Sequence, residues 1–326
     1  MKFKSKNLLV TGGAGFIGSN FIKYILDKYD DINIINLDKL TYAGNIKNTT
    51  NFLNDKRYKL IKGDICNKNL LIEIFKKYDI DGVINFAAES HVDNSILNPT
   101  KFIETNVNGV FNLLKTCYKY WMNSPNSVKK KYANARYHQI STDEVFGSIE
   151  KGSFSENCKY LPNSPYSSSK ASADLLVRSF NKTYGLNVST SICSNNYGLN
   201  QHLEKFIPKT INSILKNENI IVYGDGLNVR DWIHVLDHCS AIDIIFNKAK
   251  NGAIYNVASN FELTNLELVS ILGELCKKVP KIQFVKDRAG HDRRYSLNIT
   301  KIKKDFNWKT NYNFNDGINK IISEYE

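Results

Sequence analysis

Short apolar runs alternate with amphipathic stretches through the first part of the chain. The apolar runs are bounded by turn residues, and we expect strands at residues 7–11, 32–37, 58–62, 82–86, 137–141 and 187–193. Apolar positions that recur every three or four residues predict helices at residues 16–28, 70–77, 105–121 and 167–184. Strands that alternate with helices are typical of a doubly wound parallel sheet, so the expected fold class is α/β of the Rossmann type.

The alternation becomes looser after about residue 195. Two helical stretches are expected there, at residues 206–216 and 263–276, and a charged segment follows at 286–295. No linker rich in Gly, Ser or Pro separates the two parts. We therefore expect a Rossmann domain at residues 1–194 and a smaller C-terminal α/β region at residues 195–326, partly interleaved with the sheet.

Composition and charge exclude several classes of protein. With 42% hydrophobic and 12% aromatic residues, the chain can bury a substantial core. It has no apolar run of about 18 residues, and glycines interrupt its first apolar segment, so we predict neither a membrane association nor a signal peptide. The net charge of +12 comes from lysines spread along the chain, and nothing resembles a nucleic-acid-binding module. Six scattered cysteines without metal-ligand spacing predict free thiols, no metal site and a cytoplasmic location.

A glycine-rich turn follows the first expected strand and opens the first expected helix. Its sequence is TGGAGFIG at residues 11–18. The first glycine of such a turn permits the tight bend, the second lets the backbone approach a pyrophosphate, and the third lets the helix pack closely on the sheet. The helix N-terminus then offers N–H groups and a positive dipole end to phosphates. We predict a dinucleotide site with Gly12, Gly15, Phe16, Ile17 and Gly18 as cofactor-binding residues.

Two aspartates near later strand ends extend this predicted site. Asp38 follows the second strand, where a carboxylate can accept hydrogen bonds from both ribose hydroxyls. Because a carboxylate there would repel a 2′-phosphate, NAD is favoured over NADP. Asp64 follows the third strand and is placed to reach the adenine edge, and we add its neighbour Ile65 and Ala87 to the cofactor-binding set. The alternative is that the two aspartates only cap turns or helices.

Tyr166 and Lys170 lie four residues apart at the start of an expected helix, and so share one face of it. A lysine ammonium near a phenol lowers the phenol's pKa, which would let Tyr166 act as a base near neutral pH. The spacing alone occurs by chance on many helices. Together with the glycine-rich turn, it is a strong indication of a catalytic site.

These motifs and four further segments resemble the dTDP-glucose 4,6-dehydratase family of the extended short-chain dehydrogenases/reductases. The segments are DKLTYAGN at 38–45, AAESHVD at 87–93, STDEV at 141–145 and RAGHDRRY at 288–295. The resemblance runs almost from end to end. It implies an NAD-dependent enzyme that oxidises a nucleotide-linked hexose at C4, removes water across C5–C6 and reduces C6.

The resemblance also implies roles for the catalytic residues. Thr142 would polarise the sugar's O4, Tyr166 would take the O4 proton, and Lys170 would tune Tyr166 and bind the nicotinamide ribose. Glu144 would be the base for the C5 proton and Asp143 the acid for the C6 oxygen, chemistry that suits two carboxyl groups of which one stays protonated. Because adjacent residues of a strand point to opposite faces, a turn must bring both carboxyl groups inward.

A set of substrate-binding residues follows from the same resemblance. It comprises Ser90, Thr142, Asn196, Lys205, Arg230, Asn265, Arg288, His291 and Tyr295. Arginine suits this task because its planar fork donates in pairs to phosphate oxygens. The chain departs from the family pattern at Leu199 and Ala289, where proline is usual, and both border the nucleotide site. The choice between dTDP and UDP therefore stays open.

Assembly and rival functions complete the interpretation. The helices at 105–121 and 167–184 have apolar stripes wider than one sheet face needs. In this superfamily such helices pair into a four-helix bundle, so we predict a homodimer. The alternative is that the stripes serve core packing alone.

Rival activities are a sugar-nucleotide 4-epimerase and a UDP-glucuronate decarboxylase. The former needs no carboxylate pair, and the latter tends to have serine at the position of Asp143. A non-catalytic NAD-sensing protein would need no tuned phenol.

Overall fold

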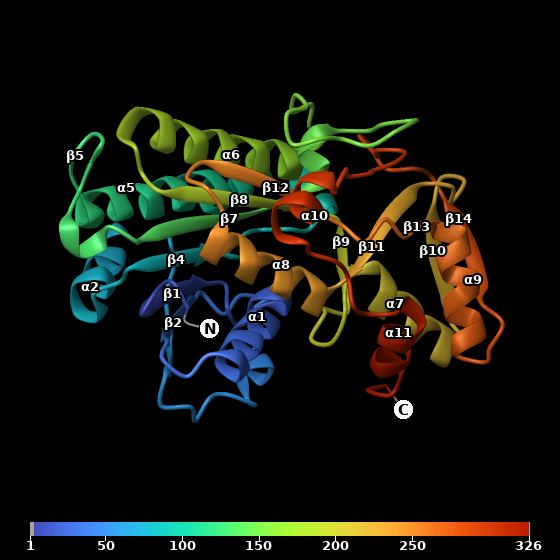
Figure 1. The fold of residues 1–326 in the computed structure, drawn as a ribbon. Coiled ribbons are helices and arrows are strands. Elements are labelled where there is room, and N and C mark those ends of the chain that lie inside the picture. Colours follow the sequence, from blue (N-terminus) through green and yellow to red (C-terminus); the bar gives the residue numbers. More distant parts are fainter. Residues whose placement is uncertain (1–2, 326) are drawn as a thin grey trace.

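The computed structural model describes residues 3–325 and is built around a seven-stranded parallel sheet (Figure 1). The strand order is β12-β8-β7-β4-β1-β2-β3. The strands are β1 Asn7–Thr11, β2 Asn33–Asp38, β3 Tyr58–Lys62, β4 Gly82–Asn85, β7 Arg136–Thr142, β8 Val188–Cys193 and β12 Ala253–Val257. The chain first adds strands on one side of β1 and then, from β4 onward, on the other. This reversal opens a crevice at the carboxyl ends of β1 and β4, where ligands bind in such sheets.

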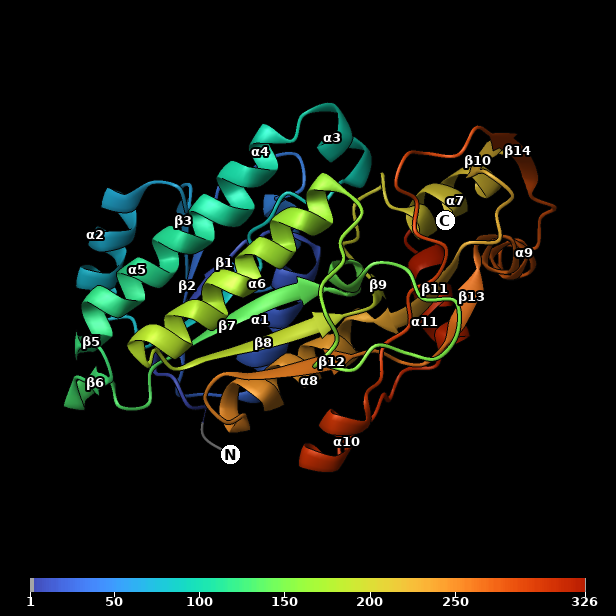
Figure 2. The same cartoon turned by 90° about the horizontal axis from the view of Figure 1, so that it is seen from above.

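Helices cover both faces of the sheet (Figure 2). Two of them pack on one face, α1 Phe16–Lys28 and α8 Val235–Lys248. Three pack on the other, α2 Lys68–Tyr78, α5 Val110–Trp121 and α6 Pro165–Tyr184. In β1, Leu8 and Val10 belong to the first of these cores and Leu9 to the second. Because β1 is buried on both faces, its sequence is a continuous apolar run.

The C-terminal part of the chain forms a smaller region beside the carboxyl ends of the strands. One small sheet contains β9 Asn195–Tyr197, β11 Val229–His234 and β13 Glu262–Thr264. The parallel pair β10 Asn219–Tyr223 and β14 Lys281–Val285 forms another. Three helices pack with these strands, α7 Phe206–Leu215, α9 Asn265–Leu275 and α11 Phe314–Ile322. The chain returns to the main sheet through α8 and β12, and α10 Thr300–Phe306 lies against β12.

Short elements complete the layers. Two short helices precede α5, namely α3 Val92–Leu97 and α4 Thr100–Phe102. A hairpin follows α5 and consists of β5 Met122–Ser124 and β6 Ser127–Val128. Within residues 3–325, no helix is long and apolar enough to cross a membrane.

The predicted α/β fold class is confirmed, and nearly all the expected elements are present with ends moved by at most two residues. The exception is the helix expected to start at residue 105, because the backbone forms a π-helix over Ile103–Gly109 before α5 begins. Inside that segment the buried Asn106 amide accepts from the Glu89 N–H at 2.9 Å and donates to the Glu89 carbonyl at 3.0 Å and to Ser169 Oγ at 2.8 Å. Such wider helical turns often occur at functional sites, and this one ties the β4 loop to α6.

The first turn of the fold requires glycine at position 12. Gly12 has φ +71°, and a Cβ added to it would lie 2.7 Å from the backbone nitrogen of Ala87. The left-handed conformation and the close approach of the loop after β4 both exclude a side chain there. Gly152, in an exposed loop, has a similar φ of +79° but no atom within 4 Å of an added Cβ.

We therefore expect Gly12→Ala to lower the free energy of unfolding more than Gly152→Ala. Gly152→Ala adds only the strain of a positive φ, about 1 kcal/mol. Gly12→Ala adds a backbone clash worth roughly 1–3 kcal/mol more. Urea unfolding followed by circular dichroism measures both variants. Equal losses would show that the close contact with Ala87 relaxes without consequence.

Candidate active site

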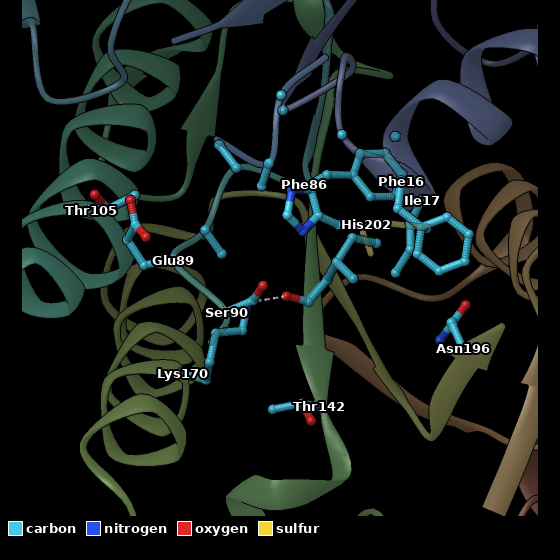
Figure 3. Close-up of a pocket in the computed structure, with 18 of the residues that line it drawn as sticks. Phe16, Ile17, Phe86, Glu89, Ser90, Thr105, Thr142, Lys170, Asn196 and His202 are labelled. Atoms are coloured by element: carbon cyan, nitrogen blue, oxygen red, sulfur yellow. Dashed lines mark hydrogen bonds between the residues drawn. The ribbon is translucent and has the colours of Figure 1, made fainter. Parts of the chain in front are cut away.

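The carboxyl ends of the central strands surround a cavity of about 320 Å³ (Figure 3). Segments far apart in the sequence meet there, from the glycine-rich turn to the loop that follows β9. Of the residues predicted from the sequence, it is lined by Gly12, Gly15, Phe16, Ile17, Gly18, Asp38, Asp64, Ile65, Ala87, Ser90, Thr142, Asp143, Glu144, Tyr166, Lys170, Asn196 and Lys205. The fold thus brings the predicted cofactor-binding and catalytic sets into one cavity.

The N-terminus of α1 is open toward this cavity. Gly15 is the N-cap residue and provides no side-chain cap, and the first turn of α1 contains no acidic residue. A Cβ on Gly18 would collide with the carbonyl oxygen of Gly12, so the helix must approach the turn this closely. Uncapped N–H groups with the positive end of a helix dipole suit an anionic ligand. The residues present therefore fit the diphosphate of a dinucleotide.

Asp38 and Asp64 both line the cavity and both also hold backbone turns. The buried Asp38 ends β2, and its two carboxylate oxygens accept hydrogen bonds from the N–H groups of Ala14 at 2.9 Å and Leu40 at 2.8 Å. Asp64 accepts from the Cys66 N–H at 2.8 Å and pairs with Lys39 at 2.7 Å. Burial alone would raise the pKa of Asp64, but Lys39 and the Cys66 N–H outweigh it and lower that pKa. The capping alternative therefore describes part of what both aspartates do, and ribose and adenine contacts stay predictions.

A short 3-10 turn places the two acidic residues of the predicted catalytic pair. β7 ends at Thr142, and Asp143–Phe146 forms the turn that follows. The Thr142 hydroxyl accepts from the Glu144 N–H at 3.4 Å and donates to Asp143 Oδ1 at 3.2 Å. The turn meets the condition set by the sequence, because both carboxyl groups reach the cavity.

The pKa values of these two carboxyl groups are shifted by burial and by neighbouring charges. Burial raises the pKa of Asp143 well above its usual range, and the negative charge of Glu144 adds to the rise. Burial also raises the pKa of Glu144, but Arg230, Arg288 and Lys205 oppose that rise. Asp143 Oδ2 is buried without a hydrogen-bond partner in the described part of the chain. A protonated Asp143 beside an ionisable Glu144 is the division that acid–base chemistry on one substrate requires.

Tyr166 and Lys170 line the cavity from the first turns of α6. The prediction that Lys170 lowers the pKa of Tyr166 is wrong for the protein by itself. Burial of the phenol raises that pKa well above its usual range, and the charge of Glu144 adds to the rise, while a hydrogen bond with Thr142 opposes it. The Lys170 ammonium instead donates to the carbonyl oxygen of Ile140 at 2.6 Å.

Five predicted substrate-binding residues do not line the cavity: Arg230, Asn265, Arg288, His291 and Tyr295. Two of them are joined, because the Arg230 guanidinium lies 4.3 Å from the centre of the Tyr295 ring. Arg288 lies 3.5 Å from Asp93, and its buried Nε has no partner among the described residues. The charges of Arg230 and Arg288 both act on Glu144. The two arginines therefore lie at the edge of the catalytic turn.

His291 and Asn265 also lie outside the cavity lining. His291 Nδ1 is 2.6 Å from Asp287, and burial, together with Arg288, lowers the pKa of the ring. Asn265 begins α9 and donates its backbone N–H to the Asn228 carbonyl at 3.1 Å. Their distance from the cavity leaves their substrate contacts as predictions.

The structure adds cavity residues that the sequence reasoning did not select. Glu89, Thr105, Cys193, Gln201 and His202 all line it. Glu89 stands in the AAESHVD segment beside the selected Ser90, so a signal for it was present. The other four come from the π-helix, the end of β8 and the loop after β9, and no motif marks them. Their proximity results from the folding of distant segments.

Comparisons with known proteins identify the family of the chain. A sequence model of the family described as GDP-mannose 4,6 dehydratase matches residues 9–321. The dTDP-glucose 4,6-dehydratase of Haemophilus influenzae is 42% identical over 333 residues, which cover 98% of this chain and 97% of that protein. The chain belongs to the dTDP-glucose 4,6-dehydratase family. The resemblance read from the sequence is thereby confirmed.

Solved structures give the same result for the fold. The dTDP-glucose 4,6-dehydratase of Streptomyces venezuelae, solved with NAD bound, is similar at a TM-score of 0.91 and 40% identity, covering 98% of this chain and 96% of that one. The enzyme of that name from Bacillus anthracis, in complex with NAD, has a TM-score of 0.87 and 44% identity at the same coverage of 98% and 96%. The family fold therefore extends over both the sheet and the C-terminal region.

The raised pKa of Asp143 predicts a stabilising but inactivating substitution. A carboxyl group whose pKa is raised on folding favours the native state below the pKa it has when unfolded, about 4, and that advantage is lost as the pH rises through its folded pKa. We expect Asp143→Asn to raise the melting temperature at mildly alkaline pH and to leave it unchanged near pH ~4. Each unit of pKa corresponds to about 1.4 kcal/mol, or a melting shift of roughly 2 °C for a chain of this size.

Differential scanning fluorimetry across this pH range measures the effect. Asp225→Asn is the control, because Asp225 is exposed and Arg293 lowers its pKa. A melting temperature of Asp143→Asn that falls below the wild type at alkaline pH would show that Asp143 is held there as a carboxylate.

Proposed function

We propose that this protein is an NAD-dependent dTDP-glucose 4,6-dehydratase, which converts its substrate into the 4-keto-6-deoxyglucose nucleotide and water. The observation that carries this proposal is the pair Asp143 and Glu144. A single turn places these two carboxyl groups in the same cavity as Tyr166 and Lys170. An enzyme that only moves hydride needs no such pair. Family membership supports the reaction class, and the names of the relatives support dTDP rather than UDP as the nucleotide.

NAD is the cofactor that the cavity fits. The glycine-rich turn and the open N-terminus of α1 would hold its diphosphate, with Asp38 at a ribose and Asp64 at the adenine. Lys170 would reach the nicotinamide ribose. Bound NAD supplies reversible hydride transfer, at C4 and then at C6, and its positively charged ring favours the phenolate of Tyr166. Because the reaction has no net redox change, we infer that NAD stays tightly bound between turnovers.

Oxidation at C4 uses Tyr166 and Thr142. Thr142 donates a hydrogen bond to O4, and Tyr166 takes the O4 proton as the C4–H bond breaks. Thr142 contacts both Tyr166 and Asp143. The resulting ketone at C4 makes the C5 proton acidic.

Elimination of water uses the two carboxyl groups. Glu144 takes the C5 proton, and the protonated Asp143 gives its proton to the C6 oxygen, which leaves as water. Once C6 has been reduced, Glu144 returns its proton to C5. At this stage Tyr166 has gained one proton and Asp143 has lost one. The Thr142 hydroxyl between them provides the route by which that proton returns.

The nucleotide part of the substrate is held by the basic edge of the cavity. Arg230 and Arg288 can donate to diphosphate oxygens, and the unpartnered Nε of Arg288 is available for such a contact. Lys205 reaches into the same cavity and donates to the Ser90 carbonyl at 3.0 Å. The remaining predicted contacts are Asn196, Asn265, His291 and Tyr295. Arg230, Arg288 and Lys205 give this side of the cavity the positive charge that attracts a nucleoside diphosphate.

The first experiment offers dTDP-glucose and UDP-glucose separately to the purified protein, with no added reductant. We expect the 4-keto-6-deoxy sugar, detected by its alkaline absorbance, to form from dTDP-glucose. Asp143→Asn and Tyr166→Phe should each lower kcat by about a hundredfold or more, because each removes a group that transfers a proton. In deuterated water the product should carry deuterium at C5, because Glu144 exchanges its proton with solvent.

Other outcomes would redirect the assignment. Formation of dTDP-galactose without a keto sugar would make the protein a 4-epimerase, and loss of carbon dioxide from UDP-glucuronate would make it a decarboxylase. Binding of NAD with no product from any of these substrates would favour a sensor.

We also propose that the protein forms a homodimer through α5 and α6. These helices lie side by side on one face of the sheet (Figure 2). Large apolar side chains are exposed on both helices, Phe111 on α5 and Leu175 on α6, and on the segments that precede α5, Ile96 and Leu97 on α3 and Ile103 in the π-helix. A second copy of the chain would cover them and complete a four-helix bundle.

A charged residue in this surface should break the dimer. We expect Leu175→Glu, which replaces a side chain 57% exposed, to shift the protein from dimer to monomer in light scattering coupled to gel filtration. Val279→Glu is the control, because Val279 is 89% exposed in the C-terminal region and should leave the dimer intact. A monomeric wild type, or a dimer that tolerates Leu175→Glu, would contradict this interface.

Two further predictions complete the proposal. We assign cofactor binding and catalysis to residues 1–194 and substrate binding to residues 195–326. All six cysteines are free thiols, which fits a reducing compartment such as the cytoplasm.

A further inference from the structure

A buried carboxyl group continues the line of the catalytic pair on α6. Tyr166, Lys170 and Asp174 follow one another at intervals of four residues, so their side chains lie on one face of the helix. Asp174 is only 5% exposed. It is absent from the cavity lining, and the proposed mechanism does not use it. Charged residues are rarely this buried without a partner or a task.

Hydrogen bonds connect this face to the end of β7. The Lys170 ammonium donates to the carbonyl of Ile140 at 2.6 Å. The carboxylate of Asp174 accepts from the hydroxyl of Ser141 at 2.5 Å. Ile140 and Ser141 directly precede Thr142, which opens the catalytic turn. α6 therefore holds two consecutive residues of the strand that carries the turn, one through a cation and the other through an anion.

The charges of Asp174 and Lys170 also support each other. Burial lowers the pKa of Lys170, and Asp174 opposes that change, followed by Cys193. Burial raises the pKa of the Cys193 thiol to about 12, so this thiol carries no charge near neutral pH. The carboxylate of Asp174 is thus the effective counter-charge of the ammonium. In return, burial raises the pKa of Asp174 to about 6, and Lys170 is the first group to oppose that rise, ahead of Ser141 and Tyr160.

The remaining surroundings of Asp174 do not neutralise it. The Tyr160 hydroxyl, from the loop before α6, lies 3.4 Å from Oδ2. The charge of Asp174 also acts on Tyr137 of β7, where it adds to the rise of the phenol's pKa that burial causes. Oδ1 is buried and has no hydrogen-bond partner among residues 3–325. An apolar residue of the same size would be easier to bury here. A role toward Lys170 gives a reason for the carboxyl group that packing does not.

We propose that Asp174 is a positioning residue, which keeps Lys170 in its charged form and, through Ser141, fixes the end of β7 that carries the catalytic turn. Its consequence for turnover rests on the proposed function. The effect of the Asp174 charge on Lys170 does not depend on a bound substrate and can be tested without one.

The direct test is a titration of Lys170 in Asp174→Asn by carbon-13 NMR of labelled lysines. The resonance that Lys170→Met removes identifies Lys170. We expect its pKa to fall by about one pH unit or more when the counter-charge is removed. Asp243→Asn is the matched control, because Asp243 is also a buried carboxylate with a lysine partner, Lys28 at 2.6 Å, but on α8. An unchanged pKa of Lys170 in Asp174→Asn overturns the proposal.

Turnover of dTDP-glucose supplies the second readout. Asp174→Asn should lower kcat at least tenfold and move the alkaline limb of the pH profile to lower pH, whereas Asp174→Glu, which keeps the charge, should restore the position of that limb. Ser141→Ala should lower kcat without changing the pKa of Lys170, because it removes only the tether.

These variants also separate the possible failures. Should Asp174→Asn not fold, an alkaline limb that moves to lower pH in Asp174→Glu although the charge is kept, or an unchanged kcat in Ser141→Ala, would overturn the proposal. If the wild type does not turn over dTDP-glucose, the proposed function fails, and the titration of Lys170 still decides the role of Asp174.

Discussion

Parallel strands direct their carboxyl ends to the same edge of a sheet, and the reversal of strand order between β1 and β4 keeps that edge open. The other features of the molecule depend on this constraint. Helix α1 turns away from β1 and exposes its N-terminus to the crevice, while β7 ends there in the catalytic turn. The loop after β9 closes the opposite side. One edge of one sheet thus brings together an uncapped helix N-terminus, two neighbouring carboxyl groups and a phenol.

Burial is what gives this edge its chemistry. The same desolvation raises the pKa of Asp143, Glu144 and Tyr166, and lowers that of Lys170. Neighbouring charges then separate the members of this group from one another. The basic residues near Glu144 oppose its rise, and Asp174 opposes the fall of Lys170. The pKa values of the carboxyl groups and of Lys170 therefore depend on charged residues around them as well as on burial.

Hydrogen bonds from α6 fix the end of β7, the strand that leads into the turn with Asp143 and Glu144. β7 is buried along nearly its whole length, and Lys170 and Asp174 of α6 bind its residues Ile140 and Ser141. A proton transfer between rigid groups requires donor and acceptor to stay within a few tenths of an ångström of their productive positions. On the other side, the Asn106 amide in the π-helix fixes the loop after β4 by pairing with the backbone of Glu89. Two segments that line the cavity, the end of β7 and the loop after β4, are thus fixed by hydrogen bonds from neighbouring helices.

The sequence alone determined the fold class, most element positions in the first part and most of the predicted residues that line the cavity. These follow from local signals: apolar periodicity, the glycine-rich turn before α1, and motifs that each occupy a few consecutive residues. Sequence also set a condition, a turn after Thr142, that the backbone fulfils.

The tertiary structure decided what depends on contacts between distant segments. It set the pKa direction of Tyr166 opposite to expectation, because burial by the whole fold and the charge of Glu144 outweigh the hydrogen bond with Thr142. The first turns of the helix predicted at residues 105–121 form a π-helix, in which Asn106 pairs with Glu89, 17 residues away in the chain. The tertiary structure left His291 and Asn265 outside the cavity and brought in Cys193 and His202. Spacing along a chain reports which residues are neighbours on one element, whereas desolvation and charge are sums over every element that packs against a group.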